Sequence, residues 1–228
     1  MVDTSADVTA DSTVREDLAV NPPKQERSRA AWERVLDAGV HILEENGYEG
    51  FTIAAVCDRA GVSVPSIYAR TKSKEALFVA VYEHALAEIR LEETVFEKYE
   101  DWSGLSAREL IAGAVEATCA RFIAHADFFR TVILRSTVNQ AIQDRGAVYS
   151  SGLSEKFSTL VLTKRDEFAH ENPEAAVDAS FRVVFSSLVV HIAYGPHFMS
   201  NRSVSNEQLV RNLQDVTIRY LLGSSLAI

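Results

Sequence analysis

The sequence predicts an all-α protein, with an N-terminal three-helix helix-turn-helix domain and a larger C-terminal helical domain. Three observations lead to this fold class. Apolar residues recur at helical spacing along most of the chain, whereas alternating β-branched runs are scarce. Hydrophobic residues make up 47% of the 228 residues, which is ample for a core. An apolar helix face and a second short helix flank a tight turn, Gly61-Val62-Ser63.

Charge and composition divide the chain into three expected segments. Residues 1–23 are acidic and have no sustained hydrophobic period, so we expect a largely disordered arm. Residues 24–78 carry eight basic and eight acidic side chains, and residues 79–228 are again acidic, within a net charge of −9. The neutral segment is the expected helix-turn-helix domain. Its cations gather near its two ends, and local potential governs docking to nucleic acid more than net charge does.

The first two helices are marked by their ends. One is predicted from near Ser28 to Asn46, where Gly47 closes it. Thr52 is the expected N-cap of the next. The buried face of that helix consists of Ile53, Val56, Cys57 and Ala60. The last two of these are small enough for a close helix crossing.

A tight turn joins this helix to the one that follows. Gly61 stands where a chain leaving a helix needs a left-handed residue. Ser63 is expected to cap a new helix that begins at Val64, with Pro65 in its first turn, where a missing N–H has no intrahelical partner.

The chemistry of this turn and of the second helix indicates DNA binding. In a helix-turn-helix the N-terminal residues of the second helix enter the major groove. The expected base-facing residues are Ser63, Val64, Pro65, Ser66 and Arg70. The expected phosphate donors are Thr52, Tyr68, Lys72 and Lys74, with Arg27 and Arg29 at the edge of the arm. Arg27 and Arg29 are expected to touch phosphates or the minor groove, and a solvated helix start is an equal alternative for both.

Residues from about 29 to 78 resemble the DNA-binding domain of the TetR family of transcriptional regulators. The motifs that carry the resemblance are Gly47-Tyr48, Ala60 to Ser63, Ile67-Tyr68 and Lys74 to Leu77. The resemblance implies that Tyr68 and Lys74 contact phosphates and that Thr52 caps its helix and touches the DNA backbone. The base-facing residues that it implies are Ser63, Val64 and Ser66.

Two departures from the family pattern limit this transfer. Arg70-Thr71 stands where the family commonly has His-Phe, and Val64-Pro65 replaces a frequent Lys-Gly. The operator sequence is therefore not predicted. Without the Phe, we expect either that Thr71 is more exposed or that another side chain fills the space beneath the turn.

Further helices are predicted along the rest of the chain. Their expected ranges are 74–96, 106–125, 128–135, 138–169, 172–194 and 205–222. Capping boxes are expected at Ser106/Glu109 and Ser205/Gln208, and Asn172-Pro173 is an N-cap followed by Pro. Gly146 and Gly152 are expected to bend or break the helix at 138–169.

The last two helices carry more apolar surface than a monomer needs. By the family resemblance, residues 172–195 and 205–222 pack against a second copy as a four-helix bundle, giving the dimer that a palindromic operator requires. The alternative is that Val183, Leu188 and Leu213 face only the chain's own core.

The resemblance also implies a small-molecule effector bound within residues 79–228. Effector binding would tilt the helix that begins at Lys74, so that the two recognition helices no longer match their half-sites and a repressor leaves its operator. Candidate pocket residues are Arg121, Phe122, His125, Phe129, Tyr149, Phe185, His191 and Tyr194, and Phe181 is a further possible wall. For each of them, a place in the core or on the surface is the simpler interpretation. Nothing in the sequence identifies the effector.

Other functional classes have less support. The six His are scattered and the two Cys are isolated, so we expect neither an enzyme, nor a metal site, nor a cofactor. The N-terminus lacks an apolar leader and polar residues interrupt the longest apolar run, 183–193, so we expect a cytoplasmic protein without a membrane segment. One alternative stays open: a helical interaction or ligand-binding module with weak or lost DNA binding.

Overall fold

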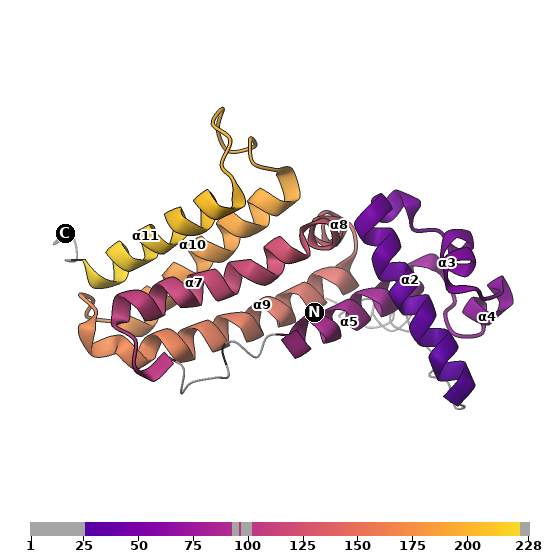
Figure 1. The fold of residues 1–228 in the computed structure, drawn as a ribbon, viewed down its shortest axis with the longest axis horizontal. Coiled ribbons are helices and arrows are strands. Elements are labelled where there is room, and N and C mark those ends of the chain that lie inside the picture. The colour runs from indigo at the N-terminus through magenta and orange to yellow at the C-terminus, as the bar shows by residue number, and fades with distance from the viewer. Residues whose placement is uncertain (1–25, 93–95, 97–101, 224–228) are drawn as a thin grey trace, which may run out of the picture. The chain divides into compact units, whose positions relative to one another are not determined.

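A computed structural model of the chain describes residues 26–92, 96 and 102–223 (Figure 1). These residues contain helices and no strand, which confirms the all-α fold class. The chain divides into two compact units, residues 1–88 and 89–228. The expected arm, residues 1–23, lies outside the described residues.

The smaller unit contains α2 (Glu26–Gly50), α3 (Ile53–Ala60), α4 (Val64–Tyr68) and most of α5 (Lys74–Glu92) (Figure 1). Within α2 the backbone leaves helical geometry at Gly47, with φ 63° and ψ −167°. The expected end of the first helix is therefore confirmed. Side chains of α2 at helical spacing are buried in the core of this unit, namely Val35, Leu36, Ile42 and Leu43.

The first half of α5 belongs to the smaller unit because it packs closely against α2. A Cβ atom on Gly39 would lie 2.4 Å from Cγ2 of Val81, so the two helices approach each other where α2 has no side chain. This packing continues beyond Phe78, and the division between the units accordingly falls after Glu88. The described part of α5 ends at Glu92, and residues 93–95, which precede the expected end at Phe96, lie outside the described residues.

The larger unit is a bundle of five α-helices among the described residues, together with one short 3₁₀ helix. Its elements are α7 (Ala107–Ala124), α8 (Ala126–Ser136), α9 (Gln140–Val161), the 3₁₀ helix η2 (Leu162–Glu167), α10 (Pro173–Tyr194) and α11 (Asn206–Leu222). α7 packs against α11 and α9, while α10 packs against α7, α8, α9 and α11 (Figure 1). Side chains from α7, α9 and α10 therefore share one core.

Two expected helix starts in this unit are confirmed and a third is half right. Ser106 and Glu109 form both bonds of a capping box, and the Asn172 side chain caps α10. Ser205 Oγ accepts from Gln208 N, at 3.2 Å. The second bond of that box is absent because the Gln208 amide donates to Asn212, one turn along α11, at 2.9 Å.

The glycines of α9 do not interrupt it, contrary to expectation. Helical geometry continues through Gly146 and Gly152 up to Val161, because a helix tolerates an interior glycine at a cost of about 1 kcal/mol. The chain becomes irregular later, at Lys164 of η2, with φ −108° and ψ 19°.

α10 is long and apolar enough to cross a membrane by length and composition alone. Its most apolar 18-residue window has a mean hydropathy of 1.5, even though polar residues stand at positions 186, 187 and 191. In the structure 39% of that window is buried, and α10 packs against four helices of its own unit. The central helix of a helical core passes the same hydropathy test.

Two glycine substitutions are expected to change stability in opposite directions. Gly39→Ala places a methyl group 2.4 Å from the stiff β-branched side chain of Val81, so the free energy of unfolding should fall by about 1–3 kcal/mol. Gly152→Ala meets nothing within 4 Å inside a helix, so the same quantity should rise by about 0.5–1 kcal/mol. Chemical denaturation followed by circular dichroism measures both. Equal effects at the two positions would contradict the close approach of α2 and α5.

Candidate nucleic-acid interface

α3 is held at both ends by the residues that the sequence indicates. Thr52 is extended and its Oγ1 accepts from Ala55 N at 3.1 Å. Gly61 adopts the left-handed conformation at φ 64°, and its N–H donates to Asp58 O at 3.3 Å. The N-cap and the glycine turn are both confirmed. The chain therefore leaves α3 in a defined direction.

Two arginines attach α3 to α2. Arg34 Nε on α2 donates to Ala60 O at 3.3 Å, which provides a partner for a carbonyl at the end of α3. Arg59 on α3 donates two bonds to the Glu45 carboxylate, at 2.6 and 2.7 Å, and this contact holds the pKa of Glu45 below its usual value. Cys57 is buried in this unit, as its small size led us to expect. α3 is thus a fixed platform for the turn.

α4, the candidate recognition helix, is only five residues long and begins at Val64. Ser63 has the extended backbone of an N-cap, but its Oγ bonds to Ser66 Oγ at 2.8 Å and caps no backbone N–H. The expected side-chain cap is wrong because Pro65 has no N–H to donate and the N–H of Ser66 bonds to Ser63 O, at 2.9 Å. Ile67 is fully buried and anchors α4.

Most of the candidate DNA-contacting side chains are exposed. The apolar side chain of Val64 is 42% exposed, and the aromatic side chain of Tyr68 is 53% exposed. The others on the surface are Arg27, Arg29, Thr52, Ser63, Pro65, Ser66 and Lys72. Exposure is what a DNA-contacting surface requires, and the contacts themselves stay predictions.

Arg70 and Thr71 behave differently from their neighbours. Arg70 is half-buried, and its Nη2 donates to Ser28 Oγ in the first turn of α2. Thr71 is 1% exposed, and its Oγ1 donates to Ile67 O at 3.4 Å. The expectation of a more exposed Thr71 is therefore wrong, because this bond provides a partner for the buried hydroxyl.

Lys74 is tied to the end of α2, which the sequence did not reveal. Its Nζ donates to Tyr48 O at 3.2 Å and lies 4.0 Å from the centroid of the Tyr48 ring. The Tyr48 hydroxyl donates to Glu75 at 2.9 Å. The Tyr48 and Phe51 rings lie 5.1 and 5.8 Å from that of Phe78. Lys74 thus has a structural role in addition to any phosphate contact.

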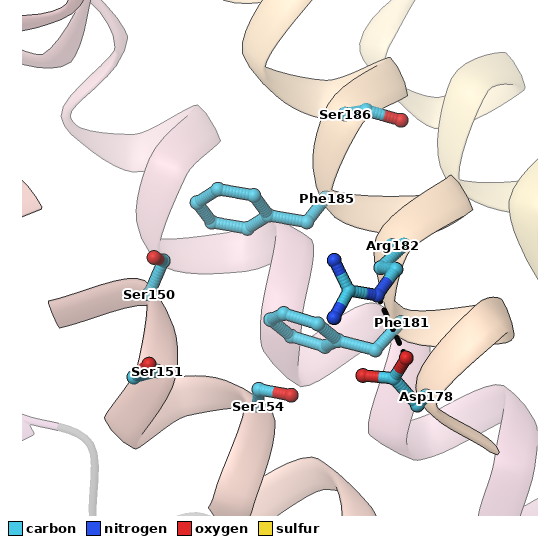
Figure 2. A pocket seen from close by; sticks show the side chains of 8 residues that line it. All are labelled: Ser150, Ser151, Ser154, Asp178, Phe181, Arg182, Phe185 and Ser186. Atoms are coloured by element: carbon cyan, nitrogen blue, oxygen red, sulfur yellow. Dashed lines mark hydrogen bonds and ion pairs between the residues drawn. The ribbon is translucent and has the colours of Figure 1, made fainter. Parts of the chain in front are cut away.

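The larger unit has a cavity of about 410 Å³ between α9 and α10 (Figure 2). Phe181 and Phe185 extend from α10 and stack with centroids 5.5 Å apart. Arg182 Nε donates to Asp178 Oδ2 at 2.7 Å. Four serines complete the lining: Ser150, Ser151 and Ser154 from α9 and Ser186 from α10. Of these residues, sequence reasoning proposed only Phe185 and its neighbour Phe181 as pocket walls.

The other pocket candidates are dispersed. Phe122, Phe129 and Tyr149 are buried and form an aromatic cluster with Phe185, in which Phe122 and Phe129 stack at 4.2 Å. His191 lines a second cavity of about 300 Å³ and bonds to Asn206 at 3.0 Å.

Neither the three aromatic residues packed against Phe185 nor the remaining three candidates line either cavity. Tyr194 is exposed and stacks on Phe198 at 4.4 Å. Arg121 and His125 lie at the end of α7. A sequence signal for the 410 Å³ cavity did exist: serines recur at 150, 151 and 154 along one helix, and Asp178 precedes Arg182 by one helical turn.

Comparisons with known proteins agree with this geometry. The model of the family "bacterial regulatory proteins, tetR family" matches residues 35–81, which include α3 and α4. The fatty acid metabolism regulator protein of Bacillus subtilis (strain 168) is 28% identical over 74 residues, 32% of this chain. That match spans 38% of the regulator's own length.

Solved structures match over most of the chain. A TetR-family transcriptional regulator from Mesorhizobium loti has a TM-score of 0.63 at 16% identity, covering 86% of this chain and 97% of its own. A transcriptional regulator from Saccharomonospora viridis, solved in complex with choline, has a TM-score of 0.62 at 16% identity, covering 81% and 94%. At such identities the likeness to solved structures shows the fold, and the family model matches the helix-turn-helix segment, residues 35–81, to bacterial regulatory proteins of the tetR family.

Proposed function

We propose that this protein is a homodimeric transcriptional repressor that binds a palindromic DNA operator and is released by a small-molecule effector. Residues 24–78 bind DNA, and residues 79–228 dimerise and hold the effector. The observation that carries the proposal is the α3–turn–α4 unit, in which a buried Ile67 supports the exposed residues Ser63, Val64 and Tyr68. A rigid scaffold below and exposed side chains above are what major-groove binding needs.

Phosphate contacts are expected to supply most of the affinity. The side chains of Tyr68 and Lys72 are exposed and make no hydrogen bond within the part of the chain that the structure describes. The same holds for Arg27 and Arg29 in the first turn of α2. Few base-reading groups are available besides Ser63 and Ser66, so binding should depend strongly on salt.

Selection of bound duplexes from a random pool tests DNA binding directly. We expect enrichment of a palindrome, because a dimer presents two equivalent recognition helices. Lys72→Ala should weaken binding to all duplexes alike and reduce the salt slope by about 1. Arg108→Ala is the control, since it removes one exposed cation from the larger unit. If no duplex is enriched, the helical interaction module replaces this proposal.

Exposed apolar side chains on the last two helices support the dimer. Val183 on α10 is 48% exposed and Val216 on α11 is 53% exposed, and Tyr220 lies one turn beyond Val216. Leu188 and Leu213 are buried within the chain's own core. Exposed Val183 therefore argues against the alternative in which all three expected residues face inward. Nearby charges are paired within each helix, so these surfaces are locally neutral.

Val216→Glu is expected to dissociate the dimer. A charge buried in an apolar interface without a partner is costly, so the dimer dissociation constant should rise at least about tenfold. Val148→Glu is the matched control, because Val148 is an exposed valine on α9, which is not part of the proposed interface. Analytical ultracentrifugation at several concentrations measures both variants. Dissociation by both variants, or by neither, would refute this interface.

The effector is proposed to bind in the 410 Å³ cavity between α9 and α10. The stacked rings of Phe181 and Phe185 offer an apolar wall. Only the Nε atom of Arg182 bonds to Asp178, and the hydroxyls of Ser151 and Ser154 make no hydrogen bond within the described residues. These groups suit an apolar molecule with a carboxylate. One relative is named a fatty acid metabolism regulator, and another was solved in complex with choline. A fatty acid and choline are therefore the two ligand classes to compare.

Filling the cavity tests this site. Decanoate should raise the melting temperature of the wild-type protein and weaken its binding to the selected duplex, whereas choline should do neither. Ser154→Trp should abolish both effects, because its ring occupies the cavity; Thr159→Trp on the same helix, outside the cavity lining, should leave them unchanged. A decanoate effect that survives Ser154→Trp would place the effector elsewhere.

Coupling between effector binding and DNA binding is proposed to run through α5. α5 begins with Lys74 in the smaller unit and continues past Glu88 into the larger one. A tilt of α5 on effector binding would change the spacing of the two recognition helices. Typical coupling energies of about 1–3 kcal/mol correspond to a 5–150-fold fall in operator affinity. The protein is proposed to act in the cytoplasm, where a bacterial operator is accessible.

A further inference from the structure

A cavity of about 260 Å³ separates the N-terminal half of α2 from α4 and the residues that follow α4. Ser28 and Trp32 line it from α2, one turn apart on the same face. Ser66 and Arg70 line it from α4 and the residues that follow. Direct packing of α4 against this part of α2 is therefore incomplete.

Arg70 bridges this cavity. Its Nη2 donates to Ser28 Oγ, across 42 residues of sequence, and the side chain is half-buried. The guanidinium is thus directed toward α2, whereas the candidate base-facing residues Ser63 and Val64 are exposed. Other contacts attach α3 to α2, such as Arg34 to Ala60, but they lie at the far end of the turn from α4.

Ser28 lies between two exposed cations, Arg27 and Arg29. All three residues belong to the first turn of α2, where backbone N–H groups have no intrahelical partner and helix ends fray. The bond from Arg70 to Ser28 connects this turn to the residues that follow α4.

We infer that Arg70 is a positioning residue: through Ser28 it holds Arg27 and Arg29 beside the recognition helix, where they contact DNA phosphates, and it does not contact a base. The inference rests on the proposed DNA-binding function. It replaces the sequence-based expectation that Arg70 faces the bases.

Ser28→Ala separates the two roles, because it removes the acceptor and leaves the charge of Arg70 intact. We expect about a tenfold loss of affinity for the selected duplex and for an unrelated duplex alike. The slope of log affinity against log salt should fall by about 1–2, as in the Arg27→Ala/Arg29→Ala variant. Ser28→Thr keeps the hydroxyl and should restore both quantities.

Arg70 variants complete the test in the full-length protein, with binding measured by fluorescence anisotropy at several salt concentrations. Arg70→Ala combined with Ser28→Ala should lose much less than the sum of the single losses, because both remove one contact. Arg70→Lys can still donate to Ser28 and should recover most of the affinity. Circular dichroism confirms that each variant is folded.

Two outcomes overturn the inference, and they differ from failure of DNA binding itself. If Ser28→Ala is silent while Arg70→Ala relaxes the preference at one base pair, Arg70 binds a base. If Ser28→Ala weakens binding with an unchanged salt slope, the bond does not position the two cations. A wild-type protein that enriches no duplex contradicts the proposed function, and this inference with it.

Discussion

The close approach of α2 and α5 is the contact on which the smaller unit depends. Gly39 lacks a side chain, so Val81 lies against the backbone of α2. This packing brings Phe78 into edge contact with Tyr48 and Phe51, and it places Lys74 over the Tyr48 ring. The end of α2 and the start of α5 therefore form one structure. α3 and α4 lie between those helices in the chain, so this junction fixes the two ends of the segment that contains them.

Electrostatics in the smaller unit divides its cations into two groups. Arg34, Arg59, Arg70 and Lys74 each bond to another element of the unit and stabilise its arrangement. The side chains of Arg27, Arg29 and Lys72 are exposed and make no hydrogen bond within the described residues. A neutral net charge is thus compatible with DNA binding, because the acidic side chains are partly matched internally and the exposed cations act locally.

The larger unit keeps two kinds of apolar surface apart. One is the core shared by α7, α9 and α10, where the rings of Phe122, Phe129 and Phe185 pack together. The other is exposed on α10 and α11 at Val183 and Val216, with charges neutralised by pairing within each helix. The first kind stabilises the fold of one chain. The second costs stability in water unless another surface covers it, which is why we assign it to a second copy.

Local chemistry allowed the sequence to determine the helices and the turn between α3 and α4. Thr52, Gly61 and Asn172 act within one turn of their own position, so their effect is visible in a short stretch of sequence. Family motifs added the expected role of the turn in DNA binding. Only the tertiary structure decided that Arg70 points to Ser28, that Lys74 lies on Tyr48, and that the serines of α9 face Phe181 and Phe185 across a cavity. Those side chains find partners far away in sequence, and the packing of helices, which no local pattern specifies, decides which partners come within reach.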